Sequence, residues 1–120
     1  EAFRSAEHAM LAEVGEMQDV VIACGGGTPC FHGNMDFMLS RGTVIYLDTS
    51  VDRIVERLTR NRSRRPLMAG KDPSQLHDEV AAGIARRLPY YTRAHVTHPG
   101  EQLEDRSQID ATVEALLPQL

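Results

Sequence analysis

VVIACGGGTP, at residues 20–29, carries the strongest structural signal in this chain of 120 residues. The β-branched and apolar run over 20–24 predicts a strand that is buried on both faces. Three glycines follow, and residues without side chains leave backbone N–H groups open to an approaching ligand. Ligands of open α/β sheets bind beyond the carboxyl ends of the strands, so we interpret Gly25, Gly26 and Gly27 as part of a binding site. A tight turn that needs positive φ is the simpler alternative.

The composition limits the kind of protein. A chain of 120 residues makes at most one domain, and a hydrophobic content of 42% is ordinary for a globular core. The sequence has neither an apolar run that could cross a bilayer nor a signal-peptide pattern, so we expect a cytoplasmic protein without a membrane partner. The net charge of −4 argues against general nucleic-acid binding. Cys24 and Cys30 are expected to be free thiols without a chemical role.

Helices and strands alternate around the opening stretch. Apolar residues recur at three- and four-residue steps over 3–14, which predicts an amphipathic helix. The same criteria predict helices at 35–39, 51–60, 74–88 and 109–117, and strands at 43–47 and 94–97. Pro89 is expected to break the fourth helix, with one further turn at 90–92. Residues 61–73 have no apolar period and are predicted to form a mobile loop.

Strands that alternate with helices predict a parallel sheet with helices on both faces. Three strands, at 20–24, 43–47 and 94–97, make a thin sheet, so the pattern is typical of the later part of a larger α/β domain. The last helix is expected to turn its apolar residues inward, namely Ile109, Val113, Leu116 and Leu117. The five histidines show no metal-ligand spacing, so we expect no metal site built from them.

The positive charge is almost entirely arginine, since Lys71 is the only lysine. Half of the twelve arginines lie within thirteen residues, at Arg53, Arg57, Arg60, Arg62, Arg64 and Arg65. The only acid in that window is Glu56. Arginine presents a planar fork to phosphate or carboxylate, so we favour an anion-binding role over a solvated helix face.

Five motifs resemble, in order and spacing, those of shikimate kinase. They are Phe3-Arg4, Gly25-Gly26-Gly27, Val44-Ile45-Tyr46-Leu47-Asp48, Arg65-Pro66-Leu67-Met68 and Arg87-Leu88-Pro89-Tyr90-Tyr91. The resemblance covers nearly the whole chain. It implies a three-layer α/β/α fold of the P-loop kinase type, with three of five parallel strands present here. It also implies transfer of the γ-phosphate of ATP to the 3-hydroxyl of shikimate, with magnesium, in aromatic amino acid biosynthesis.

The resemblance implies roles for the substrate side of the site. Arg4 and Arg87 would grip the carboxylate of shikimate, and Phe3 would pack beside its ring. Gly25, Gly26 and Gly27 would let the ring and its hydroxyls approach the backbone.

It implies roles for the nucleotide side as well. Arg65 would be a catalytic and nucleotide-binding residue on a lid at about 61–73, closing over the phosphates. Arg106 is the nearest candidate for the arginine that contacts adenine. No residue of this chain is expected to bind the metal, because most ligands of Mg²⁺ would lie outside it.

Two parts of the family pattern are missing. A Walker A loop reads G-x-x-x-x-G-K-[ST], whereas Lys71 follows Gly70 and precedes Asp72. The family's aspartate upstream of the Phe-Arg motif has no counterpart either. We therefore expect residues 1–120 to be a partial shikimate kinase domain that supplies the shikimate-binding half and the lid. This chain alone is expected to be inactive, and the intact enzyme is expected to be a monomer that binds shikimate and ATP.

The residues themselves leave alternatives open. Arg4 could face solvent on a first helical turn, Arg87 could be a favourable charge near a helix C-terminus, and Arg65 could be an ordinary loop charge. A non-catalytic module that binds a metabolite or nucleotide is one alternative function. A related kinase of a small polyol, such as gluconate, is another.

Overall fold

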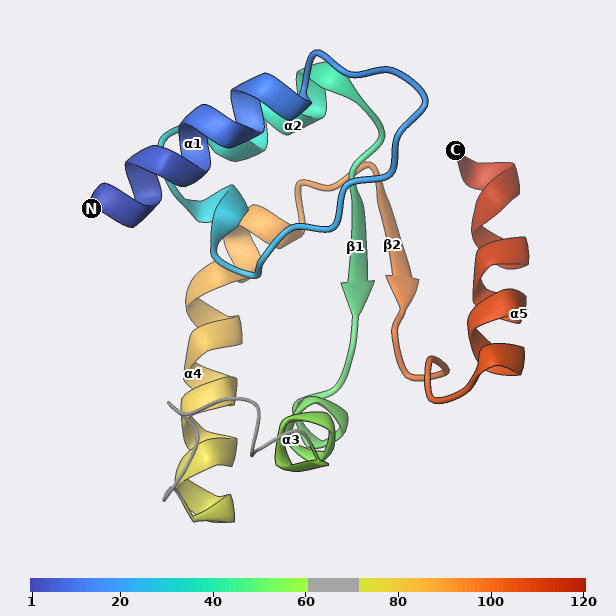
Figure 1. Ribbon diagram of the computed structural model, residues 1–120. Coiled ribbons are helices and arrows are strands. Elements are labelled where there is room, and N and C mark those ends of the chain that lie inside the picture. Colours follow the sequence, from blue (N-terminus) through green and yellow to red (C-terminus); the bar gives the residue numbers. More distant parts are fainter. Residues whose placement is uncertain (61–71) are drawn as a thin grey trace. The chain divides into compact units, whose positions relative to one another are not determined.

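The structure, a computed structural model, describes residues 1–60 and 72–120 (Figure 1). Contacts within the chain define two compact units. Unit 1 consists of Glu1–Tyr46 and Arg87–Val96, and unit 2 consists of Leu47–Arg86 and Thr97–Leu120. The loop predicted at 61–73 lies outside the described residues except at its last two positions.

Five α-helices form in the described residues, close to the predicted positions. They are α1 (Ala2–Val14), α2 (Asn34–Arg41), α3 (Val51–Arg60), α4 (Pro73–Tyr91) and α5 (Arg106–Leu116). Two 3-10 helices, η1 (Thr28–Cys30) and η4 (Leu117–Gln119), accompany them. Short polar side chains cap several of the helix starts, as such residues do in isolated helices. The Ser50 hydroxyl accepts from the N–H of Arg53 at 3.2 Å, and the Asp105 carboxylate accepts from the N–H of Gln108 at 2.9 Å.

Pro89 lies inside α4, and the prediction that it breaks the helix was wrong. A proline removes one N–H donor and normally disturbs a helix interior. Here it stands in the last turn, where Thr92 closes the helix by donating its N–H to the Leu88 carbonyl at 2.9 Å. The Thr92 hydroxyl donates to the same carbonyl at 3.0 Å. Neither bond needs the proline nitrogen, so the helix continues to Tyr91.

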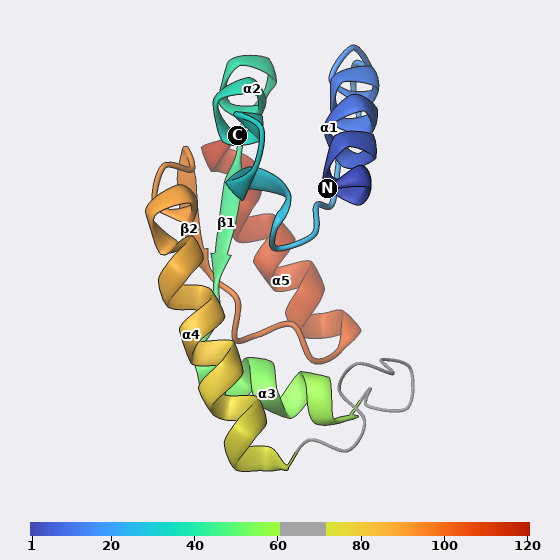
Figure 2. The ribbon, with the colours of Figure 1, turned by 90° about the vertical axis from the view of Figure 1, so that its left-hand side faces the viewer.

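Strands β1 (Ile45–Asp48) and β2 (Val96–Pro99) pair in a two-stranded sheet. They run in the same direction, as both ribbon views show (Figures 1 and 2). The N–H of Val96 donates to the Val44 carbonyl at 3.1 Å, and the N–H of Gly100 donates to the Asp48 carbonyl at 2.8 Å. These two predicted strands are confirmed, although each begins two residues later than expected.

The strand predicted at 20–24 does not form. Its residues are not buried: Val21 is 101% exposed, and Val20 and Ile22 are 48% and 46% exposed. Inside a core, a strand needs neighbours for its N–H and C=O groups. The sheet of the described residues consists of β1 and β2 and offers this stretch no partner. The sheet therefore has two strands in the described part of the chain, not three.

Few apolar side chains of the described residues are fully buried: Leu11 and Met35 in unit 1, and Leu76 in unit 2. The inward orientation predicted for the last helix was wrong, because Ile109 and Val113 are 40% and 48% exposed. An apolar stripe shows which face of a helix favours burial but not whether a surface is present to cover it. Among the described residues, none of the helices is long and apolar enough to cross a membrane.

Candidate functional site

The triglycine turn, Gly25–Gly27, meets both predicted substrate-binding arginines within unit 1. A Cβ atom on Gly27 would stand 2.6 Å from Nη2 of Arg4. A Cβ atom on Gly26 would stand 3.0 Å from Nη1 of Arg87. The structure thus brings the two guanidinium groups to the same turn, as the sequence predicts.

Close approach, not backbone conformation, explains why glycine stands in this turn. Gly27 has φ of −88°, which any residue can adopt. Gly33 is the glycine with positive φ in the described chain. The alternative of a tight turn that needs positive φ is therefore wrong for this stretch. A side chain at position 27 would instead displace the Arg4 guanidinium.

Arg4 is held in place on the first turn of α1. Its Nη1 lies 2.9 Å from the carboxylate of Glu7, one turn further along the helix. Its guanidinium carbon stacks 4.1 Å from the centre of the Phe31 ring and 5.2 Å from that of Phe3. The side chain is 24% exposed. The alternative in which Arg4 simply faces solvent does not agree with these contacts.

Glu7 joins α1 to the residue after the triglycine turn. One carboxylate oxygen contacts Arg4, and the other accepts from the Thr28 hydroxyl at 2.9 Å. Burial opposes ionisation of Glu7, but the hydrogen bonds from Arg4 and Thr28 outweigh it and hold the pKa of this carboxyl below its ordinary value. Glu7 is therefore an anion at neutral pH, the state that balances the charge of Arg4.

Asn34, the first residue of α2, binds the backbone carbonyl of Thr28, whereas Glu7 binds the hydroxyl. It is fully buried, at 0% exposure. Its amide Nδ2 donates to the Thr28 carbonyl at 2.9 Å. Its Oδ1 lies 2.6 Å from Nδ1 of His8 and can only accept, so Nδ1 of His8 carries the proton. These contacts give His8 a structural role.

Arg87 lies in the penultimate turn of α4, and Tyr91 follows it one turn later on the same helix face. The Tyr91 hydroxyl donates to the Gly26 carbonyl at 2.5 Å. The Tyr91 ring packs against the ring of Tyr46, with centroids 5.1 Å apart. The helix end thus carries both an arginine and a hydrogen-bond donor to the glycine turn.

The two cysteines are free, as expected. Burial raises the pKa of Cys30, and the charges of Arg87 and Arg4 only partly offset that effect. Burial also raises the pKa of Cys24, and the charge of Glu7 adds to it. Both thiols are therefore protonated at neutral pH and poor nucleophiles.

A hollow of about 340 Å³ adjoins the triglycine turn in unit 1. Its walls come from one face of α1 and from residues 22–25, and most of its lining is apolar. Arg4 and Arg87 do not line it. The charged groups that could bind an anion therefore lie beside this hollow and not inside it.

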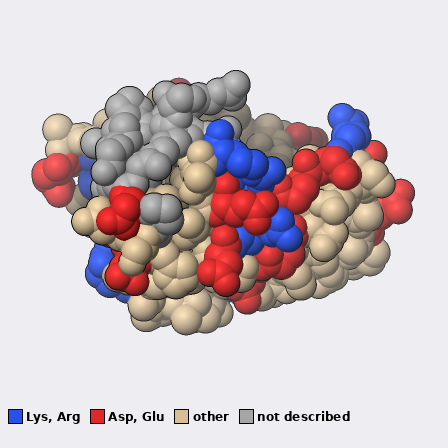
Figure 3. Space-filling model, turned by 90° about the horizontal axis from the view of Figure 1, so that it is seen from below, with Lys and Arg blue, Asp and Glu red and all other residues tan. Residues whose placement is uncertain are grey.

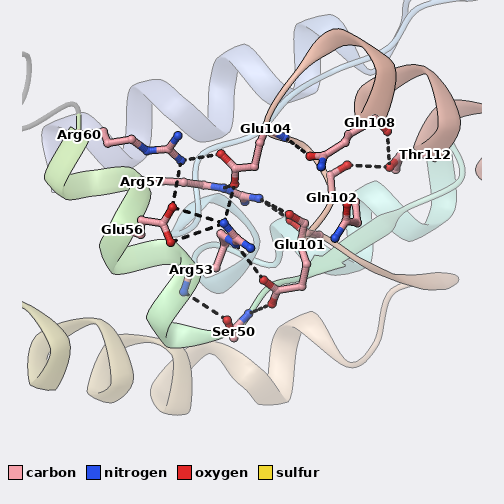
Figure 4. Close-up of polar contacts among 11 residues, drawn as sticks. Ser50, Arg53, Glu56, Arg57, Arg60, Glu101, Gln102, Glu104, Gln108 and Thr112 are labelled. Carbon is pink, nitrogen blue, oxygen red and sulfur yellow. Dashed lines mark hydrogen bonds and ion pairs between the residues drawn. The ribbon is translucent and has the colours of Figure 1, made fainter.

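The arginines of α3 bind the chain's own carboxylates. In unit 2, Arg57 Nε lies 3.0 Å and Arg60 Nη2 2.5 Å from the carboxylate of Glu104. Arg53 contacts Glu101 at 3.3 Å and Glu104 at 3.5 Å (Figure 4). Hydrogen bonds from Arg60 and Arg57 outweigh burial and lower the pKa of Glu104. Acidic and basic side chains are accordingly interleaved on the face in Figure 3.

These ion pairs correct the anion-binding interpretation for Arg53, Arg57 and Arg60. The carboxylates of Glu101 and Glu104 that face them lie 44 to 51 residues further along the chain, where a local count of acids does not find them. The other arginines of that run, Arg62, Arg64 and Arg65, lie outside the described residues. The role predicted for Arg65 therefore stays a prediction.

Arg106 is the first residue of α5, and its side chain is 88% exposed. It forms an ion pair with Asp110 at 3.0 Å, one turn further along the helix. The two acidic residues that precede Arg106 have different contacts: Asp105 caps α5, and Glu104 forms ion pairs with α3. The predicted contact of Arg106 with adenine is not tested by these observations. In the described part of the chain, no cluster of three or more His, Cys, Asp or Glu residues could hold a metal ion.

An α/β fold in which two arginines flank a glycine turn is an arrangement suited to binding a small anionic ligand. The family model for shikimate kinase matches residues 1–117. The shikimate kinase of Bacteroides fragilis is 41% identical over 96% of this chain and 64% of its own length, and that of Phocaeicola vulgatus is 38% identical over 100% and 69%. The crystal structure of shikimate kinase from Bacteroides thetaiotaomicron matches 98% of this chain and 68% of its own, with 39% identity and a TM-score of 0.93.

The chain belongs to the shikimate kinase family. The fold class predicted from the sequence is thereby confirmed. The chain spans about two thirds of the length of the relatives that it matches. Sequence reasoning identified Arg4, the triglycine turn and Arg87 but missed Glu7, Asn34 and Tyr91. Two local signals were available: Glu7 lies one helical turn after Arg4, and Tyr91 lies one turn after Arg87.

Proposed function

We propose that this chain supplies the shikimate-binding half of an enzyme that phosphorylates the 3-hydroxyl of shikimate with ATP, in the biosynthesis of aromatic amino acids by way of chorismate. The approach of Arg4 and Arg87 to one triglycine turn is the observation that carries the proposal. The names of the curated relatives and of the matching crystal structure support the choice of substrate.

The carboxylate of shikimate is the group that the two arginines would bind. A guanidinium group donates two parallel hydrogen bonds to a carboxylate, and each charge-assisted bond contributes about 1.5–3 kcal/mol. The absence of side chains on Gly26 and Gly27 leaves room for the ring to reach the backbone. Phosphoryl transfer depends mainly on such positioning, because the acceptor hydroxyl must lie in line with the phosphate.

The proposal assigns the nucleotide side to other residues. Arg65 would act on the transferring phosphate from the lid, where closure excludes water and prevents hydrolysis. Arg106 would contact adenine, and its exposure leaves its guanidinium accessible to a ligand. Residues 1–120 contain no G-x-x-x-x-G-K-[ST] motif, so the triphosphate would be bound by residues outside this stretch. A polypeptide of these 120 residues alone would then not transfer phosphate.

Magnesium assists this class of phosphoryl transfer by neutralising phosphate charge. The described residues contain no cluster of three or more His, Cys, Asp or Glu residues that could hold a metal ion. The proposal therefore routes no step through a metal bound to the described residues. The proposal includes a cytoplasmic, monomeric enzyme in its intact form, as the family resemblance implies.

The experiment compares shikimate with gluconate as acceptor, using the natural chain that contains residues 1–120. Isothermal titration and a coupled ADP-release assay are run with each compound. We expect shikimate to bind and to be phosphorylated, and gluconate to do neither. Phosphorylation of gluconate would support a polyol kinase instead, and binding of shikimate without turnover at saturating ATP would support a non-catalytic binding module.

A further inference from the structure

We propose that Tyr91 is a positioning residue that orients the triglycine turn toward the ligand and fixes its distance from Arg87. This inference rests on the proposed function, because it assigns a role within the same shikimate site. In this inference Tyr91 contacts the backbone of the turn and does not contact the substrate itself.

The three carbonyl groups of the turn have different kinds of partner. The Gly25 and Gly27 carbonyls accept from the backbone N–H groups of Thr28 and Cys30, at 3.1 and 3.0 Å. Those bonds are local and belong to the turn and to η1. The Gly26 carbonyl accepts instead from the Tyr91 hydroxyl, which comes from 65 residues further along the chain. The thiol of Cys30 is 4.0 Å from the same oxygen, a much weaker contact.

The bond to the Gly26 carbonyl also sets the direction of the next N–H group. All peptide bonds of the described residues are trans. In a trans peptide the carbonyl and the following N–H lie in one plane and point in opposite directions within it. By holding the Gly26 carbonyl toward α4, Tyr91 therefore aims the N–H of Gly27 away from α4. Gly27 is the residue that Arg4 approaches, so this N–H is oriented on the side where we place the ligand.

The Tyr91 hydroxyl is itself held in a fixed place. Its ring packs on Tyr46 of β1 with an angle of 34° between the ring planes. Aromatic pairs at this separation are favourable and restrict the motion of both rings. Through this hydroxyl, the positions of β1 and of the end of α4 determine the position of the glycine turn.

Tyr91 also controls the distance between the turn and Arg87. The two side chains lie on one face of α4, and each stands 3.0 Å from the Cβ position of Gly26. Loss of the hydroxyl would release the turn from α4 without moving the charge of Arg87. The expected consequence is weaker binding of shikimate. Its carboxylate would no longer contact Arg87 while its hydroxyls contact the glycine turn.

The test replaces Tyr91→Phe, which keeps the ring and its packing on Tyr46 and removes only the hydroxyl. Tyr90→Phe is the matched control, because Tyr90 is the preceding residue of the same helix and is 39% exposed. Loss of one hydrogen bond predicts that the KM for shikimate rises roughly three- to tenfold in Tyr91→Phe. The KM for ATP should not change, and the melting temperature should fall by no more than the few degrees that one lost hydrogen bond implies. The control should match the parent enzyme in all three.

A second measurement needs no substrate. In a ¹⁵N–¹H spectrum of the ligand-free protein, the amide signal of Gly27 should move in Tyr91→Phe and not in Tyr90→Phe. A further variant, Gly26→Ala, places its Cβ against the same hydroxyl. Combined with Tyr91→Phe, it should raise the KM for shikimate by less than the product of the two single effects.

The outcomes separate this inference from the proposed function. A parent enzyme that neither binds nor phosphorylates shikimate would refute the proposed function, whatever Tyr91 does to the Gly27 amide. An active parent with an unchanged KM for shikimate in Tyr91→Phe would overturn the role of Tyr91. Equal increases in the KM for shikimate and for ATP, with a lower melting temperature, would also overturn it, because they would indicate a purely structural role.

Discussion

The Thr28 hydroxyl donates to the carboxylate of Glu7 at 2.9 Å, which joins α1 to the residue that follows the triglycine turn. The other oxygen of the same carboxylate holds Arg4. One acidic side chain thus fixes both a binding group and the backbone beside it. The arrangement makes the position of Arg4 depend on Glu7, although we expect no contact between Glu7 and the substrate.

Glu7→Gln is the first prediction. The amide can still accept from Thr28, but it no longer carries the charge that holds Arg4. We expect the KM for shikimate to rise roughly three- to tenfold, with a smaller change in kcat. Steady-state kinetics with shikimate varied at saturating ATP will measure this. Glu13→Gln, at an exposed position of the same helix, is the control and should leave both constants unchanged.

Removal of the two arginines that we propose bind substrate should affect the binding of shikimate more than turnover. In Arg4→Ala and Arg87→Ala, loss of a charge-assisted contact predicts a Kd for shikimate that rises between about tenfold and a hundredfold. Titration calorimetry measures this directly. Arg86→Ala, an exposed neighbour on α4, should bind shikimate normally. An unaltered Kd in Arg87→Ala would remove Arg87 from the site.

Arg65→Ala should show the opposite pattern. We place this arginine on the transferring phosphate, so its loss should lower kcat more than the loss of Arg4 or Arg87. The Kd for shikimate should stay within about twofold of the parent value, since the carboxylate contacts remain. Single-turnover kinetics distinguish this from slow product release. A larger fall in kcat for Arg4→Ala than for Arg65→Ala would contradict the assignment.

Gly27→Ala should weaken substrate binding without unfolding the protein. The new Cβ would meet the end of the flexible Arg4 side chain at 2.6 Å, so the arginine must move away while the turn can persist. We expect a raised KM for shikimate and a melting temperature close to that of the parent. Gly42→Ala is the control, because a Cβ there meets nothing within 4 Å and φ is −168°. A lower melting temperature in Gly27→Ala, with none in Gly42→Ala, would contradict this prediction, because it would show that the turn cannot accommodate the added Cβ.

Local signals in the sequence were sufficient for most of the fold. The bounds of α3 follow from an apolar period and from Ser50 as a cap, both of which lie within a few residues. The stretch at 20–24 has an equally clear apolar pattern, but a strand also needs a partner strand, and the described residues provide none. Apolar character indicates a preference for burial, whereas burial itself depends on surfaces that are distant in the sequence.

The same difference applies to the candidate site. Arg4, the three glycines and Arg87 belong to short motifs, and the sequence was enough to find them. Asn34 and Tyr91 act on Thr28 and Gly26 through bonds that span 6 and 65 residues, and their residue types alone do not reveal such bonds. The arginines of α3 were misinterpreted for a related reason, since their acidic partners lie far along the chain.

The last prediction concerns the ion pairs between α3 and the segment that precedes α5. Ionised Glu101 and Glu104 are favoured in the folded state: a backbone hydrogen bond from Ser50 lowers the pKa of Glu101, and hydrogen bonds from Arg60 and Arg57 lower that of Glu104. A carboxyl group whose pKa is lower in the folded state stabilises the fold above its unfolded pKa, whose ordinary value is 4.5. That contribution is lost as the pH falls from this value through the folded pKa.

Stability should therefore fall more steeply below about pH 4.5 in the parent protein than in Glu104→Gln, which has one such carboxylate fewer. Urea unfolding at pH 7 and at pH 3.5 measures the difference. At pH 7 the variant should be less stable than the parent, and the gap should narrow at pH 3.5. Glu114→Gln, at an exposed position of α5, is the control and should follow the parent at both pH values. A gap that stays constant with pH would show that the charge of Glu104 does not stabilise the fold.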